Sequence, residues 1–180
     1  GAFETPLGQI SVDENLVAQM THVSRIISDI PAAHAQEHSL EIQLPFLQVV
    51  LGNFSIVPLV MGDQTADVCR ELADIIVKLA VNRRILVVAS SDLSHFHDDK
   101  KARQLDGIIL RCIEDYDIEG LLENLNGDKA EACGGGPIAV TMMASKKMGA
   151  RRSHLLNYAN SGDVTGDKRS VVGYAAAVCY

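Results

Sequence analysis

The apolar positions along the chain predict helices alternating with strands. Between Asp13 and Ser28 they recur at helical spacing, and Asp13 is placed to cap the first turn. From Arg84 to Ala89 they form a continuous run, the pattern of a strand buried on both faces. The other predicted helices are 37–51 (interrupted at Pro45), 65–80, 98–115, 118–125 and 137–148, with Pro137 at the first position, and the other strands are 54–61, 154–158 and 171–179.

Strands separated by helices predict a three-layer α/β sandwich around a central sheet. Because the alternation is incomplete, we expect this sheet to be mixed or mostly parallel. The 180 residues suffice for a substantial core, and no linker or repeat divides them. We therefore expect a single α/β domain over residues 1–180.

Charge and cysteine content narrow the classes of function. The net charge is −7 and the basic pairs are scattered, which predicts no nucleic-acid binding. No apolar run approaches the roughly 20 residues that span a bilayer, so no membrane segment is expected. The four cysteines lie far apart without a CxxC pair, which favours a reduced, cytoplasmic setting. No feature specifies an oligomeric state.

The strongest local motif, Ser90–Phe96, follows the predicted buried strand. Open α/β sheets place ligand sites beyond the carboxyl ends of their strands. Asp92 and His95 are three apart, so a turn or a helical start would aim both at one point. A carboxylate beside an imidazole serves a general base or a metal ligand equally well. The alternative is a helix cap beside a surface histidine, and His97 is expected to point elsewhere.

A second motif, Cys133–Pro137, joins a cysteine to three glycines before a predicted helix. Consecutive glycines allow close backbone approach and positive φ, and their amides create a positive potential that favours a thiolate. The alternative is a tight turn with an incidental cysteine.

In a third motif, Glu37–Phe46, His38 and Glu41 share a helical face, and helix capping explains this motif equally well. The polar stretch 157–167 is expected to form a loop at the rim of the pocket.

Five segments, in this order, resemble the Memo family, whose prokaryotic members are often called AmmeMemoRadiSam system protein B: Phe3–Gly8, Glu37–Glu41, Ser90–His95, Cys133–Ile138 and Asn157–Asp163. Each motif alone is weak, whereas five in order over nearly the whole chain are specific. The resemblance implies a fold related to class III extradiol ring-cleavage dioxygenases, with non-haem Fe(II) in a pocket at one sheet edge.

By this resemblance Cys133 matches the family's metal-binding cysteine, and Asp92 and His95 match groups of the same pocket. His95 falls at the general-base position of the related dioxygenases, and His38 matches a further pocket-side residue. The family's N-terminal segment, whose His-Ala-Gly and Ser-His-His-type motifs supply two metal-ligating histidines, has no counterpart here. The chain is therefore expected to lack that segment and to be unable to assemble the family's three-ligand iron site by itself. It is expected either to hold Fe(II), or less readily Cu or Zn, weakly through Cys133, His95 and Asp92, or to hold no metal.

Three hypotheses about function follow. The first is a non-haem metal-dependent oxidoreductase, in which Cys133 anchors Fe(II) or Cu and His95, oriented by Asp92, moves protons. The second is a metal-free thiol hydrolase, with Cys133 as nucleophile, His95 as base and the glycine amides as oxyanion hole. The third is a non-catalytic module whose pocket binds a small-molecule or peptide ligand.

Overall fold

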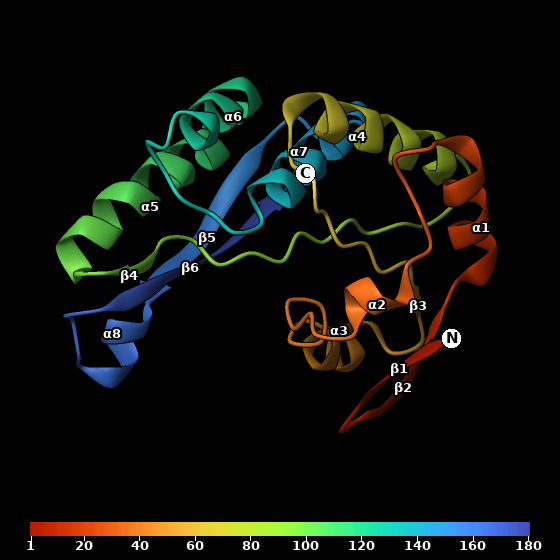
Figure 1. Ribbon diagram of the computed structural model, residues 1–180, viewed down its shortest axis with the longest axis horizontal. Coiled ribbons are helices and arrows are strands. Elements are labelled where there is room, and N and C mark those ends of the chain that lie inside the picture. Colours follow the sequence, from red (N-terminus) through yellow and green to blue (C-terminus); the bar gives the residue numbers. More distant parts are fainter. The chain divides into compact units, whose positions relative to one another are not determined.

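A computed structural model describes all 180 residues, which form two compact units, Gly1–Gly62 and Asp63–Tyr180. Figure 1 labels the helices and strands of each. Both units combine helices with short strands, which confirms the predicted α/β class. The strands form two separate open sheets, ordered β1-β2-β3 in the first unit and β4-β6-β5 in the second. None of the helices has both the length and the apolar character needed to cross a membrane.

The sheet of the first unit is mixed. Strands β1 (Ala2–Thr5) and β2 (Gly8–Val12) form an antiparallel hairpin, and β3 (Ser55–Ile56) pairs with β2 in parallel. The strand predicted over 54–61 is thus confined to two residues. Ile10, Met20 and Leu44 are the buried apolar residues of this unit.

The helices of the first unit depart from the predicted boundaries. Helix α1 (Glu14–Val23) begins as predicted, because the Asp13 carboxylate accepts the Leu16 N–H at 2.9 Å, but it ends at Ser24, which is extended. The helix predicted over 37–51 is wrong in its first half: α2 (Pro31–His34) is followed by turns, and α3 is Leu44–Leu51. Pro45 lies in the first turn of α3, where its missing N–H costs nothing, and so begins this helix rather than interrupting it.

The helices of the second unit lie close to their predicted positions. They are α4 (Ala66–Ala80), α5 (Asp99–Glu114), α6 (Ile118–Asn126) and α7 (Gly135–Lys147). Helix α7 begins two residues before Pro137, so this proline lies within the first turn and not at the first position. Helix α4 packs on α7, α6 packs on α5 and α7, and α5 covers the strands β5 and β6.

The sheet of the second unit is antiparallel. Strands β5 (Ser153–Asn160) and β6 (Val171–Cys179) form its long ladder and lie side by side in Figure 1. The stretch predicted as a rim loop supplies the end of β5 and the short helix α8 (Ser161–Thr165), which contacts both strands. The three-residue strand β4 (His95–His97) pairs with the first residues of β6.

The strand predicted over 84–89 is the main error. This segment has no strand partner, and Leu86 and Val88 are 66% and 47% exposed, so it is not buried on both faces. A hollow of about 600 Å³ is lined by residues 85–89 and, on β6, by Ala175, Ala177 and Cys179. An apolar run indicates that a segment avoids water, but it cannot specify which strand will pair with it.

Candidate metal centre

The segment that carries Asp92 and His95 is held to β6 by its buried middle. Leu93 and Ser94 are 3% and 0% exposed. The Leu93 N–H donates to the Gly173 carbonyl at 2.9 Å, and the Gly173 N–H donates to the Ser94 carbonyl at 3.0 Å. Asp92 and His95 therefore stand on either side of a pair of residues that cannot move without breaking the sheet.

A buried carboxylate fixes the same segment from α5. Asp106 is fully buried; it accepts the Ser94 N–H at 2.9 Å and the Tyr158 hydroxyl at 2.7 Å. Burial, and then the contact with Asp106, hold the pKa of Tyr158 far above its usual value. A Cβ on Gly173 would lie 2.0 Å from Asp106 Oδ2, so only glycine fits where β6 passes this carboxylate.

The side chains of Asp92 and His95 meet at the end of this segment. The imidazole Nε2 lies 3.2 Å from Asp92 Oδ2, and the two side chains are 46% and 35% exposed, Asp92 being the more open. The predicted turn or helical start is instead the strand β4, yet the two groups still meet. Burial, and the negative charge of Asp92, raise the pKa of Tyr174 nearby.

Phe96, between the two histidines of β4, has a left-handed backbone with φ of +62° and a ring that is 77% exposed. This conformation is uncommon for a residue other than glycine. The pairing of β4 with β6 shifts register between His95 and His97 at this point. The irregularity directs His97 toward Glu131, with Nε2 3.0 Å from each carboxylate oxygen, so His97 ties β4 to the loop that leads to Cys133. Nothing in the local sequence of His97 or Glu131 links the two.

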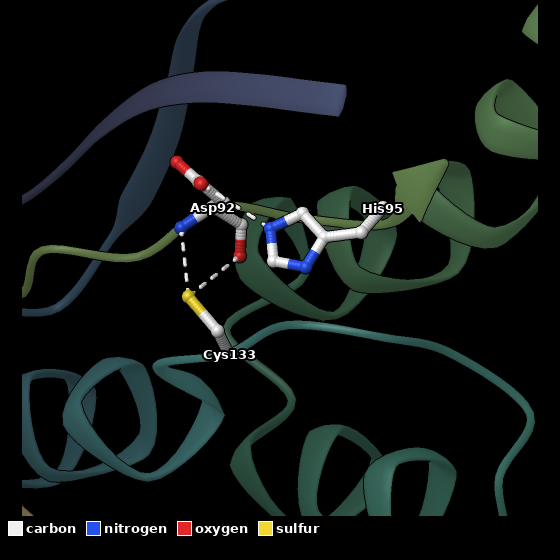
Figure 2. Close-up of side chains that lie close together, drawn as sticks. All are labelled: Asp92, His95 and Cys133. Atoms are coloured by element: carbon white, nitrogen blue, oxygen red, sulfur yellow. Dashed lines mark hydrogen bonds and ion pairs between the residues drawn. The ribbon is translucent and has the colours of Figure 1, made fainter. Parts of the chain in front are cut away.

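Cys133 meets Asp92 through the main chain. The Asp92 N–H donates to the Cys133 sulfur at 3.2 Å, and the Cys133 N–H donates to the Asp92 carbonyl, also at 3.2 Å. Figure 2 shows the sulfur and the imidazole reaching Asp92 from different segments. The hydroxyl of Ser91 lies 3.8 Å from the sulfur. An N–H aimed at sulfur stabilises the thiolate, which is the form that binds metal.

The three glycines after Cys133 permit close packing rather than an unusual backbone. None of them is among the residues with positive φ, contrary to expectation. A Cβ would lie 2.7 Å from Ser91 Cβ at Gly134, 2.6 Å from a methyl group of Leu125 at Gly135, and 2.8 Å from Gln64 Cβ at Gly136. Their amides are already used: Gly134 donates to Ser91 Oγ, Gly135 to the Ala132 carbonyl and Gly136 to Gln64 Oε1.

The Asp92 carboxylate, the His95 imidazole and the Cys133 thiol can serve together as metal ligands. One ligand atom from each lies within 4.8 Å of the others. Ligand atoms around one tetrahedral ion, with metal–ligand bonds of about 2.0 to 2.3 Å, lie about 3.3 to 3.8 Å apart, so the side chains would draw together by up to roughly 1 to 1.5 Å to complete the site. Sulfur, nitrogen and oxygen donors suit Fe, Zn or Cu better than Mg or Ca, so the residues fit the expected metals.

A cavity of about 400 Å³ opens beside these ligands. His95 and Cys133 line it together with Gln64, Glu131 and the apolar side chains of Leu122 and Leu125. Gln64, which precedes α4, was not predicted as a site residue, because nothing in its local sequence connects it to a turn 70 residues away. A small molecule held here would lie against an apolar wall with His95 and Cys133 at its edge.

His38 lies in the first unit, in the turns that precede α3. Its Nδ1 is 2.9 Å from Glu41 Oε1, as the shared face predicted, and its side chain is 82% exposed. The carboxylate of Glu37 accepts the N–H groups of His38 and Ser39 within these turns, but no helix begins here. Helix α3 starts at Leu44 and its N-cap residue Gln43 makes no side-chain cap, so the helix-capping interpretation of this motif is wrong. The proposed pocket-side role of His38 stays a prediction.

The fold and the site together define an α/β protein with a partly exposed Asp-His-Cys cluster of metal-ligand type. The model of the family described as Memo-like protein matches residues 1–178, and the chain belongs to the Memo family. Relatives named MEMO1 family protein are 43% identical over 180 residues in Methanobrevibacter smithii, 41% over 177 in Sulfolobus acidocaldarius and 44% over 177 in Ignicoccus hospitalis. The matches cover 99%, 97% and 97% of this chain but only 64%, 62% and 62% of those relatives.

Proposed function

We propose that this chain binds a redox-active transition metal, preferably Fe(II), through Asp92, His95 and Cys133. We further propose that it functions as a non-haem metal-dependent oxidoreductase. The observation that carries the proposal is the convergence of three different donor atoms within 4.8 Å. Three protein ligands leave coordination positions open, which is the arrangement of catalytic rather than structural metal sites.

The chain's own residues have distinct roles in this proposal. Cys133 anchors the ion, and the Asp92 N–H neutralises part of the thiolate charge. Asp92 keeps Oδ2 on the imidazole and offers Oδ1 as a ligand. His95 accepts or donates a proton at the cavity edge when it is not coordinated, and its pairing with Asp92 fixes the ring orientation. A bound metal would polarise an oxygen of the substrate or take part in electron transfer.

The geometry disfavours the thiol-hydrolase alternative. The hydrogen bonds of the Cys133 sulfur involve Asp92 and Ser91, and none involves His95, so the imidazole is not placed to deprotonate it directly. The amides of Gly134, Gly135 and Gly136 are occupied by Ser91, Ala132 and Gln64 and cannot form an oxyanion hole without breaking these bonds. The non-catalytic binding module stays the second candidate, because the cavity beside the ligands has an apolar wall that suits a small-molecule or peptide group.

The proposal extends to the fold, the cellular location and the kind of ligand. We place the chain in a three-layer α/β sandwich of the extradiol-dioxygenase kind, supported by the alternating helices and strands and by the position of the ligands beside the open sheet of the second unit. All four cysteines are free thiols, which supports a cytoplasmic location. The mixed charge of the chain and the size of the cavity support a small molecule or peptide as the ligand, and no nucleic acid.

Anaerobic titration with Fe(II) and Co(II), with bound metal measured by equilibrium dialysis, tests this proposal. The chain should bind one metal per molecule at saturation, whereas Cys133→Ser and His95→Ala should bind markedly less and Cys179→Ser should match the parent chain. Equal retention by Cys133→Ser and the parent chain would rule out the site. Metal binding without any oxygen consumption or product across a panel of small aromatic substrates would favour the binding module instead.

A further inference from the structure

The side chain of Gln64 joins the two ends of the glycine turn that follows Cys133. Its Nε2 donates to the Cys133 carbonyl at 3.0 Å, and its Oε1 accepts the Gly136 N–H at 2.7 Å. The two ends of the amide cannot be exchanged, because a carbonyl requires a donor and an N–H requires an acceptor. One side chain thus sets the separation and the direction of both peptide groups.

The backbone of Gln64 is itself anchored in the core of the second unit. Gln64 stands two residues before α4, and the thiol of Cys69, which is fully buried in that helix, lies 3.5 Å from the Gln64 carbonyl and 3.8 Å from the Gly136 carbonyl. Helix α4 packs along α7. The absence of a Cβ at Gly136 allows the glutamine to approach, since that atom would lie 2.8 Å from Gln64 Cβ. Gln64 therefore acts from a rigid base.

Two segments hold Cys133 from opposite sides. From the segment of Asp92, the Ser91 hydroxyl accepts the Gly134 N–H at 2.8 Å, and the Asp92 carbonyl accepts the Cys133 N–H. From the start of α4, Gln64 supplies the Cys133 carbonyl with a donor. With both its N–H and its carbonyl fixed, the backbone of Cys133 is held beside Asp92, and with it the Cα–Cβ bond that carries the sulfur.

We propose that Gln64 is the positioning residue that holds the Cys133 sulfur against the Asp92 N–H and thereby sets the metal affinity of the Asp92-His95-Cys133 site. The inference rests on the proposed function for its metal, but the placement of the sulfur is independent of it. Outer groups that orient a ligand typically contribute ten- to a hundredfold to metal affinity, so the loss of Gln64 should weaken binding by roughly that factor.

The variant that tests this is Gln64→Met, which keeps the length of the side chain and removes both hydrogen bonds. Gln64→Asn keeps the amide but is one methylene too short to reach both peptide groups, and it serves if the first variant folds poorly. Asn126→Leu is the matched control, because Asn126 lines the same cavity and has no hydrogen bond to the glycine turn. Urea unfolding of each variant establishes that its fold is retained.

Two measurements are made on the same proteins. Cobalt titration gives the dissociation constant and the thiolate-to-cobalt absorption, which reports whether the sulfur is a ligand. Amide hydrogen exchange without metal gives the protection of the Asp92 and Gly134 N–H groups, which Gln64 does not touch. In Gln64→Met we expect weaker binding by about ten- to a hundredfold, a smaller absorption band and faster exchange at both amides, while Asn126→Leu behaves as the parent chain.

Each outcome decides the inference. Parent-like affinity and parent-like exchange at Asp92 in Gln64→Met would overturn it. So would an equal loss of affinity in Asn126→Leu, because the effect would then belong to the cavity wall. If the parent chain binds no cobalt, the proposed function fails, whereas exchange at the Asp92 amide still shows whether Gln64 positions the sulfur.

Discussion

The Asp92 N–H points at the sulfur of Cys133 from 3.2 Å, and the Cys133 N–H returns to the Asp92 carbonyl at the same distance. This reciprocal pair joins segments that lie 41 residues apart. It brings together a carboxylate and a thiol that carry like charges when ionised, and such a pair is unfavourable unless a cation or hydrogen-bond donors compensate it. The arrangement fits the proposed metal site, in which a cation would balance both groups.

Asp92→Asn tests this electrostatic explanation. The substitution keeps the shape of the side chain, removes its charge and weakens its contact with His95. We expect cobalt affinity to fall by at least about tenfold, since both a ligand oxygen and the orientation of the imidazole are weakened. Glu131→Gln is the control, because its carboxylate lines the same cavity but pairs with His97. An equal fall in both variants would mean that only the general negative potential matters.

Asp106 should contribute to stability through its two buried hydrogen bonds. In Asp106→Ala the Ser94 N–H and the Tyr158 hydroxyl lose their acceptor in the core, so the free energy of unfolding should fall by roughly 2 to 4 kcal/mol. Tyr158→Phe, which removes one partner, should cost about 1 kcal/mol. Urea unfolding of both variants and of the double variant measures the coupling. Strict additivity would contradict the direct Tyr158–Asp106 bond.

Gly173→Ala should be destabilising for a steric reason alone. The new Cβ would lie 2.0 Å from Asp106 Oδ2, and the carboxylate cannot withdraw without breaking its bonds to Ser94 and Tyr158. We expect the free energy of unfolding to fall by about 2 to 4 kcal/mol. The matched control is Gly107→Ala, next to Asp106 in α5, where a Cβ meets nothing within 4 Å. This substitution should raise the free energy of unfolding by about 0.5 to 1 kcal/mol, because alanine favours the helix more than glycine does. Thermal unfolding that ranks the two variants in the opposite order would refute this account of Gly173.

The carboxylate of Asp99 should make the stability of the protein fall in acid. The Asn160 amide bonded to its carboxylate at 2.8 Å, and then the charges of Arg103 and Lys168, hold the pKa of Asp99 below its usual value. Because the folded pKa is the lower one, this stabilisation is complete above the unfolded value of about 4 and is lost as the pH falls through the folded pKa. Urea unfolding midpoints should be measured from neutral pH downward. Below a pH of about 4 they should fall less steeply in Asp99→Asn than in the parent chain. Glu123→Gln, which alters an exposed carboxylate of α6, should follow the parent chain.

The sequence predicted helices better than strands, and the reason is local. The helices α4, α5 and α6 were predicted because the apolar periodicity that marks a helix lies within the helix itself. The run 84–89 was apolar enough for a buried strand, but strand pairing depends on a partner elsewhere in the chain. The hairpin of β1 and β2 was missed because strands of four and five residues carry too little periodicity.

The candidate site was predicted where residues of distinctive chemistry stood beside a structural signal. Asp92, His95 and Cys133 met this condition, and the structure brings them together, although the turn expected at His95 is a strand. Gln64 and Glu131 did not meet it. A glutamine before a helix and a glutamate in a loop are ordinary in sequence, and only their contacts with Cys133, Gly136 and His97 give them a place beside the site.

The left-handed residue Phe96 has a consequence for how two imidazoles share this corner of the protein. Side chains two apart on a regular strand project from the same side, so His95 and His97 would otherwise contend for one carboxylate. With the left-handed backbone of Phe96 between them, each imidazole pairs with its own carboxylate: His95 with Asp92 and His97 with Glu131. The first ring thus stands among the candidate metal ligands, while the second anchors the loop that leads to Cys133.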